Sequence, residues 1–206
     1  MSIVLVGSTS GSITLQEPAV AGSTVLDFPA TSGTLITTGS SGQVIPKAAL
    51  PTGSVLQVVQ TIKTDTFSTN STSFTDVTGL SVSITPTSSS SKILILSTTA
   101  VSGFSQAYQL TLRLVKNSTA IFVGDSSGSR SLGFYGADGS VFGSNVVLPQ
   151  TIVYLDSPAT TSSTTYKIQG QVSTEWTWYV NRSVTDSDAT SSTRTASSII
   201  VMEIAA

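Results

Sequence analysis

Hydrophobic and polar residues alternate with a period of two over most of the chain from Val55 onward. The clearest segments are 80–84 (LSVSI), 108–114 (YQLTLRL) and 165–172 (TYKIQGQV). A strand with this alternation buries one face and leaves the other in water, as in antiparallel sheets. We therefore predict that each of these segments is a strand of an antiparallel sheet.

Other segments are apolar on both faces. They are residues 55–62 (VLQVVQTI), 92–97 (KILILS), 151–155 (TIVYL) and 198–204 (SIIVMEI). We expect these to be central strands or strands covered on both sides. Turn-forming clusters separate the strands, and no segment has the pattern of a long helix. The sequence thus predicts about nine or ten strands in an all-β sandwich or jelly roll, although alternation does not reveal strand order.

The first 45 or so residues follow a different pattern. Gly11, Gly22 and Gly33 recur at a spacing of eleven, each followed by a hydroxyl residue. Such glycines suit turns with positive φ between short strands, while chance repetition is the alternative in a chain so rich in Ser, Thr and Gly. A repeat this poor in apolar residues needs neighbours to bury a face. We predict an attachment or short shaft segment at 1–45, a linker at 46–54 and a sandwich domain at 55–206.

Composition restricts the possible chemistry. Only 10% of residues are charged, against about 25% in an ordinary chain, the net charge is -2, and Cys and His are absent. This inventory excludes thiol nucleophiles, disulfides, zinc held by Cys or His, and Ser–His triads. Nine dispersed cations make a poor phosphate-binding surface, so we expect no nucleic-acid partner. The apolar runs are too short to cross a bilayer, and no signal peptide is readable.

The acidic residues are few and scattered. Asp186 and Asp188 could hold calcium loosely, but the further ligands and the glycine of a dedicated loop are missing, so a solvated turn is the favoured interpretation. Asp125 and Asp138 flank an aromatic stretch. Glycoside hydrolysis requires two carboxylates facing each other across a cleft, which the sequence does not indicate. We expect no enzymatic activity, no metal and no cofactor.

The most concentrated aromatic feature is the segment 175–182 (EWTWYVNR). On a strand, Trp176 and Trp178 would share one face and Tyr179 would lie on the other. Aromatic rings beside Asn, Asp or Arg suit the apolar C–H faces and hydroxyls of sugars. Trp176, Trp178, Tyr179 and Arg182 are therefore candidates for glycan contact. Two tryptophans two residues apart on a strand are more typical of a core, and for them that is the favoured interpretation.

A second aromatic cluster lies in the glycine-rich segment 130–144 (RSLGFYGADGSVFGS). Its pattern predicts a long exposed loop or irregular hairpin, and exposed loop aromatics are candidates for contact. We therefore add Phe134 and Tyr135 to the glycan-binding candidates. The alternative is that these side chains fold back on the sandwich.

Several stretches together resemble fibre-type structural proteins of tailed bacteriophages, particularly marine and cyanobacterial ones. They are 7–39 (GSTSGSITLQEPAVAGSTVLDFPATSGTLITTG), 55–95, 112–130 (LRLVKNSTAIFVGDSSGSR) and 197–204 (SSIIVMEI). The resemblance implies a homotrimeric tail fibre with a C-terminal head of the tumour-necrosis-factor-like jelly-roll kind. In a trimer, three copies would bury Val4, Val6, Ile13 and Leu15 about a common axis. The family offers no catalytic motif to transfer.

The resemblance implies a protein made in the host cytoplasm and located in the virion tail. Its N-terminal segment would attach to the tail baseplate or another virion protein, and its head would bind a host-surface polysaccharide. One alternative is a capsid decoration or collar fibre without receptor binding. A polysaccharide depolymerase is a minor alternative, and a secreted adhesin module is disfavoured because no signal peptide is readable.

Overall fold

The computed structural model describes residues 2–6, 12–16, 50–103 and 108–206. The chain divides into two units, Met1–Ile45 and Pro46–Ala206. The glycine repeat at Gly11, Gly22 and Gly33 lies outside the described residues, as do residues 46–49 of the predicted linker. Each unit is described by itself below.

In the first unit, β1 (Ser2–Val6) and β2 (Ser12–Gln16) form an antiparallel pair. The register pairs Val4 with Thr14, Val6 with Ser12, Leu5 with Ile13 and Ile3 with Leu15. The residues predicted for a trimer core therefore differ in their ladder partners. Val4 and Val6 are paired with hydroxyl residues, whereas Ile13 and Leu15 are paired with apolar residues. A two-stranded ladder is marginally stable by itself, so this pair requires further packing partners.

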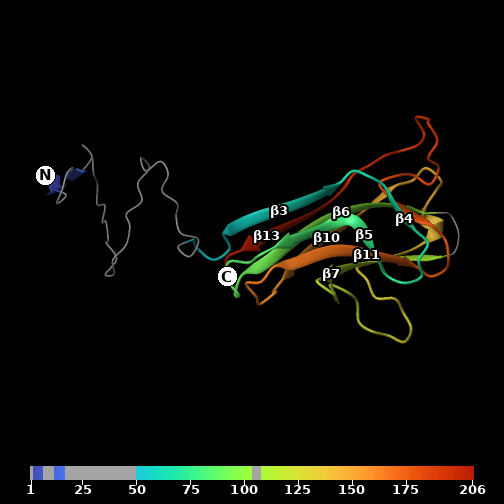
Figure 1. Cartoon of the computed structure of the whole chain (residues 1–206), viewed down its shortest axis with the longest axis horizontal. Helices are drawn as coiled ribbons and strands as arrows, with labels where there is room; N and C mark the ends of the chain where they lie inside the picture. The colour runs from blue at the N-terminus through green and yellow to red at the C-terminus, as the bar shows by residue number, and fades with distance from the viewer. Residues whose placement is uncertain (1, 7–11, 17–49, 104–107) are drawn as a thin grey trace. The chain divides into compact units, whose positions relative to one another are not determined.

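The second unit is an all-β sandwich of two antiparallel sheets (Figure 1). The six-stranded sheet contains β3 (Val55–Lys63), β4 (Phe67–Thr69), β6 (Lys92–Gly103), β10 (Leu148–Asp156), β12 (Trp178–Val180) and β13 (Ser197–Ile204). The five-stranded sheet contains β5 (Thr75–Ile84), β7 (Gln109–Lys116), β8 (Thr119–Ile121), β9 (Tyr135–Asp138) and β11 (Thr164–Val172). A 3-10 turn, η2 (Gly139–Val141), precedes β10. The all-β prediction is confirmed, and within the described ranges no helix is long and apolar enough to span a membrane.

The strand order is that of a jelly roll. One sheet runs β3-β13-β6-β10, and the other runs β5-β11-β7 with β8 and β9 both pairing with β7. The short strands β12 and β4 extend the first sheet beyond β13 and β3, because β12 pairs with the last residues of β6. The long strands β3, β5, β6, β7, β10, β11 and β13 thus alternate between the sheets along the chain, which joins the two layers into one sandwich.

The predicted alternation determines what is buried. Leu80, Val82 and Ile84 of β5 face the core. The alternating apolar residues of the neighbouring strands do so too: Leu110, Leu112 and Leu114 of β7, and Tyr166, Ile168 and Val172 of β11. Gly170 of β11 lies against the indole of Trp178, where a Cβ atom would overlap the ring. The absence of a side chain at this position therefore allows the largest core residue to lie directly on the opposite sheet.

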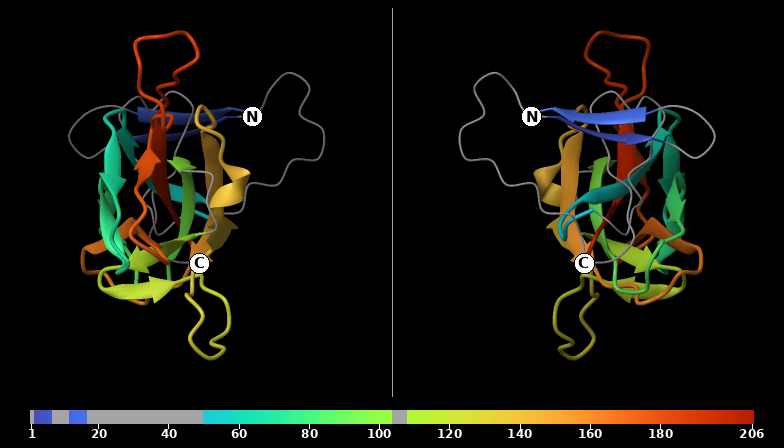
Figure 2. Two further views of the ribbon diagram at one scale, coloured as in Figure 1. Left: turned by 90° about the vertical axis from the view of Figure 1, so that its right-hand side faces the viewer. Right: turned by 90° about the vertical axis from the view of Figure 1, so that its left-hand side faces the viewer.

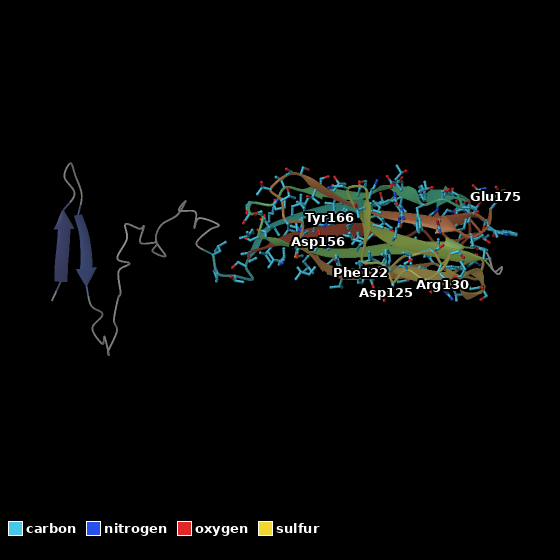
Figure 3. The ribbon with its side chains drawn as sticks, turned by 90° about the horizontal axis from the view of Figure 1, so that it is seen from below. Phe122, Asp125, Arg130, Asp156, Tyr166 and Glu175 are labelled. Carbon is cyan, nitrogen blue, oxygen red and sulfur yellow. The ribbon has the colours of Figure 1, made fainter. Side chains whose placement is uncertain are left out.

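A polar cluster links the two sheets inside the core. The Tyr166 hydroxyl on β11 donates to Asp156 Oδ2 on β10 at 2.7 Å, and Lys116 Nζ lies 3.0 Å from the same carboxylate oxygen (Figure 3). Burial, followed by the hydrogen bond to Asp156, raises the pKa of the Tyr166 hydroxyl. Because the carboxylate is paired with both a cation and a hydroxyl, its burial is compensated.

Two segments expected to be central or doubly covered are edge strands. In the described part of the chain, β3 pairs only with β13, and β10 pairs only with β6. The prediction for 55–62 and 151–155 was therefore wrong, because their second apolar face lies on the exposed side of the six-stranded sheet. Segments 92–97 and 198–204 lie in β6 and β13, which are central as predicted.

Candidate functional site

The aromatic segment 175–182 lies at one end of the sandwich. Glu175 is at the end opposite the C-terminus (Figures 1 and 3), and we call this the distal end. From here the chain passes through β12 into the loop 181–196, which extends away from the sheets (Figure 2). The distal end thus combines the aromatic candidates with an extended polar loop.

Trp176 is held flat against the core. Its ring stacks on that of Tyr108, with centroids 6.2 Å apart and an interplanar angle of 5°. Tyr108 is buried, whereas Trp176 is 44% exposed. The preceding turn is fixed to β7, because Ser173 N donates to the Gln109 carbonyl at 2.9 Å and Ser173 Oγ accepts from Gln109 N. The arrangement presents a positioned, accessible indole, as a sugar ring would require.

Trp178 is fully buried, so it is a core residue and is not accessible to a ligand. It packs edge-on against Phe67 with centroids 5.7 Å apart. The two tryptophans do not share a strand face, because β12 begins only at Trp178 and Trp176 lies in the turn before it. The period-two pattern assumed a strand that extends over both residues.

Tyr179 and Arg182 form a second contact near the distal end. Tyr179 is half-buried, and the Arg182 guanidinium lies 4.5 Å from the centre of its ring. Arg182 also donates from Nε to the Ser183 carbonyl at 2.9 Å and from Nη2 to the Val184 carbonyl at 2.8 Å. The guanidinium therefore holds the first turn of the loop, and most of its donors are engaged inside the protein.

The base of the loop is anchored by Asn181, a buried residue with φ of 63°. Its side-chain Nδ2 donates to the carbonyls of Lys63 at 2.8 Å and Asp65 at 3.0 Å. Its Oδ1 accepts from Ser197 Oγ at 2.6 Å. One side chain thus joins the loop to the end of β3 and the start of β13. Asn tolerates this left-handed conformation better than most residues do.

The loop encloses an open polar cavity of about 420 Å³. It is lined by Asp186, Ser187, Asp188, Ala189, Ser192 and Arg194. Arg194 donates two hydrogen bonds to Asp186, from Nε to Oδ1 at 2.9 Å and from Nη2 to Oδ2 at 2.6 Å. Arg182 Nη1 lies 3.2 Å from the same carboxylate. The lining offers donors and acceptors of the kind that bind sugar hydroxyls.

Asp186 and Asp188 of the loop do not form a metal site with other acidic residues of the described ranges. Two guanidinium groups occupy Asp186, and within the described residues no three Asp or Glu side chains gather as a metal site would require. Asp138, one of the two acids that flank the second aromatic stretch, accepts a hydrogen bond from Ser140 N at 2.8 Å within its own turn. The sequence interpretation missed the Asp186–Arg194 fork, because its partners are separated by eight residues without local periodicity.

Phe134 and Tyr135 lie on the other sheet, beside β7. Phe134 N donates to the Leu112 carbonyl at 3.0 Å, and both side chains are half-buried against the core. Burial raises the pKa of Tyr135. The side chains adopt the folded-back arrangement that was the alternative to an exposed loop. An exposed aromatic that the sequence interpretation did not select is Phe122, which packs against Tyr154 with centroids 4.9 Å apart (Figure 3).

No protein-family model and no curated protein matches the chain. Among solved structures, infectious bursal disease virus of the Gt strain aligns with a TM-score of 0.37 and 11% identity, covering 98% of this chain and 46% of that one. The structure of the Gx strain aligns with a TM-score of 0.33 and 14% identity, covering 97% of this chain and 46% of that one. The VP2 subviral particle of this virus aligns with a TM-score of 0.29 and 14% identity, covering 72% of this chain and 41% of that one. The chain thus spans less than half of each, and likeness of this degree establishes no shared function.

Proposed function

We propose that the chain is a structural protein of a virion, a homotrimeric tail fibre of a tailed bacteriophage that binds a host-surface glycan without cleaving it. The resemblance of residues 7–39, 55–95, 112–130 and 197–204 to phage fibre proteins supports the virion assignment. The observation that carries glycan binding is Trp176, an exposed ring stacked on buried Tyr108 at the distal end.

The direction of the chain supports this placement. The sandwich begins beside its own C-terminus, because Gly53 N donates to the Ala205 carbonyl at 2.8 Å and Ala205 N donates to Ser54 O at 2.9 Å. The chain that follows the N-terminal segment therefore enters the sandwich at the end opposite Trp176. Attachment to the baseplate or another virion protein through that segment would leave the distal end free for the host.

In this proposal the apolar face of a sugar lies on the Trp176 indole, and hydroxyl and carboxylate groups of the loop cavity receive other parts of the glycan. Each site is small, and Arg182 is already engaged within the loop. Single-site affinity would therefore be weak. Three sites on a trimer would raise the avidity by roughly 10² to 10⁴ over one site.

The second candidate is a capsid decoration or collar fibre without receptor binding. Two observations favour it: Trp178 is buried in the core, and Arg182 serves the loop's own structure. Neither candidate requires an enzyme, and we propose none.

Binding of the purified full chain to an array of bacterial surface polysaccharides separates these candidates. We expect saturable binding that Trp176→Ala weakens about 5-fold or more, since a ring stacked on an aromatic side chain, as measured for nucleic-acid bases, is worth about 1–3 kcal/mol. Phe122→Ala is a matched control, because Phe122 is also an aromatic residue of 44% exposure but lies away from the distal end. Both variants are checked for unchanged native mass. Binding that Trp176→Ala leaves intact, or no binding at all, contradicts the proposal.

A further inference from the structure

The outer face of the six-stranded sheet carries apolar residues where water-facing polar residues are expected. The strand registers align them across β3, β13, β6 and β10 in adjacent rows. One row is Val58, Met202, Leu94 and Leu155, and the next is Gln60, Ile200, Leu96 and Val153. The third row is Ile62, Ser198, Thr98 and Thr151. We call these three rows the apolar face.

The exposed side chains lie mainly along its two edges. Val153 and Leu155 on β10 are 68% and 53% exposed, and Val58 and Ile62 on β3 are 55% and 59% exposed. Residues of the central strands β6 and β13 are half-buried by these neighbours. The apolar surface therefore extends over the full width of the sheet.

The other sheet provides an internal comparison. Its outer face carries Ser81, Ser83, Lys167 and Gln169, and Lys167 pairs with Asp76 at 2.7 Å. This is the wet face that an antiparallel sheet normally presents. One sheet thus has a polar outer face suited to water, and the other has an apolar outer face. This difference indicates that the apolar face is covered when the protein functions.

The size of the face matches the centre of a protein interface. Four strands about 4.8 Å apart and six residues rising about 3.3 Å each give a face of roughly 400 Å². A stable interface buries about 800 Å² per partner, and its buried centre is more apolar than its rim. The apolar face is therefore large enough to form that centre, with the polar strand ends around it as the rim.

The chemistry of the face suits an identical partner. Its three rows contain no charged residue, so two copies meet without repulsion. Its polar members, such as Gln60, Thr98 and Ser198, carry hydroxyl or amide groups that both donate and accept, so they can pair with polar groups of a neighbouring copy. A partner recognised by charge would find nothing here to select it.

We propose that the apolar face is the surface through which copies of this chain associate. This inference specifies the assembly surface of the proposed trimer and rests on that part of the proposed function. The occupant is a second copy of the sandwich, with the β10 and β3 edges both buried by neighbouring copies.

The test is the native mass of the full chain, measured by light scattering behind a sizing column. Three copies of 21.2 kDa give 63.6 kDa. Val153→Glu with Leu155→Glu introduces two charges into the apolar face on β10, and Val58→Glu introduces one on β3. The matched control is Ser81→Glu with Ser83→Glu, which places the same two charges on the outer face of the other sheet. Circular dichroism confirms that each variant is folded.

We expect the wild-type chain and the serine control to have the same multiple of 21.2 kDa, and both apolar-face variants to fall to 21.2 kDa while still folded. A monomeric wild-type chain at micromolar concentration overturns the inference. Apolar-face variants that fold and keep the wild-type mass also overturn it. A dimer that these variants dissociate supports the face but refutes the trimer. A wild-type chain that associates through this face but binds no glycan refutes only the glycan binding of the proposed function.

Discussion

At the scale of single residues, the protein depends on a few buried polar side chains that hold loops to strands. Asn181 and Glu203 are the clearest cases, since each is buried and each satisfies several partners. Neither was selected from the sequence, because their partners are far away along the chain. Removing such a residue costs stability chiefly because its buried hydrogen-bond partners are left unpaired.

Asn181→Ala should reduce the free energy of unfolding by about 3 kcal/mol, because it leaves the carbonyls of Lys63 and Asp65 without their donor and puts alanine at positive φ. Chemical denaturation at fixed protein concentration measures this. Asn145→Ala, at an exposed loop position, is the control and should cost less than about 0.5 kcal/mol. A loss under about 1 kcal/mol at Asn181 would show that the loop is anchored elsewhere.

Glu203 links stability to pH. Its carboxylate accepts hydrogen bonds from Thr87 N and Thr87 Oγ1 at 2.7 Å. Burial alone would raise the pKa of Glu203, but the hydrogen bonds from Thr87, Ser91 and Gln57 outweigh it, so the pKa lies below its ordinary value. A lowered pKa in the folded state means that the ionised form stabilises the fold above the unfolded pKa, and that this stability is lost as the pH falls through the folded pKa.

Glu203→Gln should therefore lower the free energy of unfolding by about 2 kcal/mol at pH 7, and the difference from wild type should shrink as the pH falls below about 4.5. Denaturation curves at several pH values follow both proteins. Exposed Glu175→Gln is the control, and we expect it to change stability by less than about 0.5 kcal/mol. A gap between Glu203→Gln and wild type that stays constant down to pH 3 would contradict this role of the carboxylate.

At the scale of strands, alternation in the sequence located the buried faces correctly. Leu80, Val82 and Ile84 are buried as the period of two predicts. The same pattern could not assign strand order, because pairing partners are distant in sequence. Nor could it distinguish a strand covered on both sides from an edge strand with an exposed apolar face, which is why 55–62 and 151–155 were misplaced. A covered strand and such an edge strand have the same kind of sequence and differ only in the strands or layers that lie beside them.

Packing between strands also determines the glycine at position 170. Gly170→Ala would push a Cβ atom of β11 into the Trp178 indole, so we expect a loss of about 1–3 kcal/mol in the free energy of unfolding. Gly136→Ala on β9 is the matched control, because a Cβ there meets nothing within 4 Å. Equal stabilities of the two variants, measured by denaturation with tryptophan fluorescence, would mean that the sheets separate easily at this point.

The aromatic site was partly predictable at this scale. The composition of 175–182 identified the segment that carries the proposed site, but the point at which the turn becomes β12 separates exposed Trp176 from buried Trp178. The stacking partner Tyr108 lies far back in the chain, so no local pattern could indicate it. The sequence therefore located the aromatic residues and could not predict how they are arranged.

At the scale of the whole molecule, the sandwich has distinct surfaces with separate proposed tasks. The distal end carries Trp176 and the polar loop, and the apolar face is the proposed surface for self-association. The two surfaces differ in charge, because the three rows of the apolar face contain no charged residue whereas the loop carries Arg182, Asp186, Asp188 and Arg194. Self-association would place several copies of a weak glycan site on one particle, which is how small sites reach useful avidity.

The central claim is that a host glycan contacts Trp176. The chain has two tryptophans, and Trp178 is buried, so a change in tryptophan fluorescence on ligand addition reports chiefly on Trp176. We would titrate the full chain with a polysaccharide from the array. We expect a saturable spectral change that is lost in Trp176→Ala, together with binding that this variant weakens about 5-fold or more. Binding without any change in fluorescence, or equal binding by the variant, would contradict it.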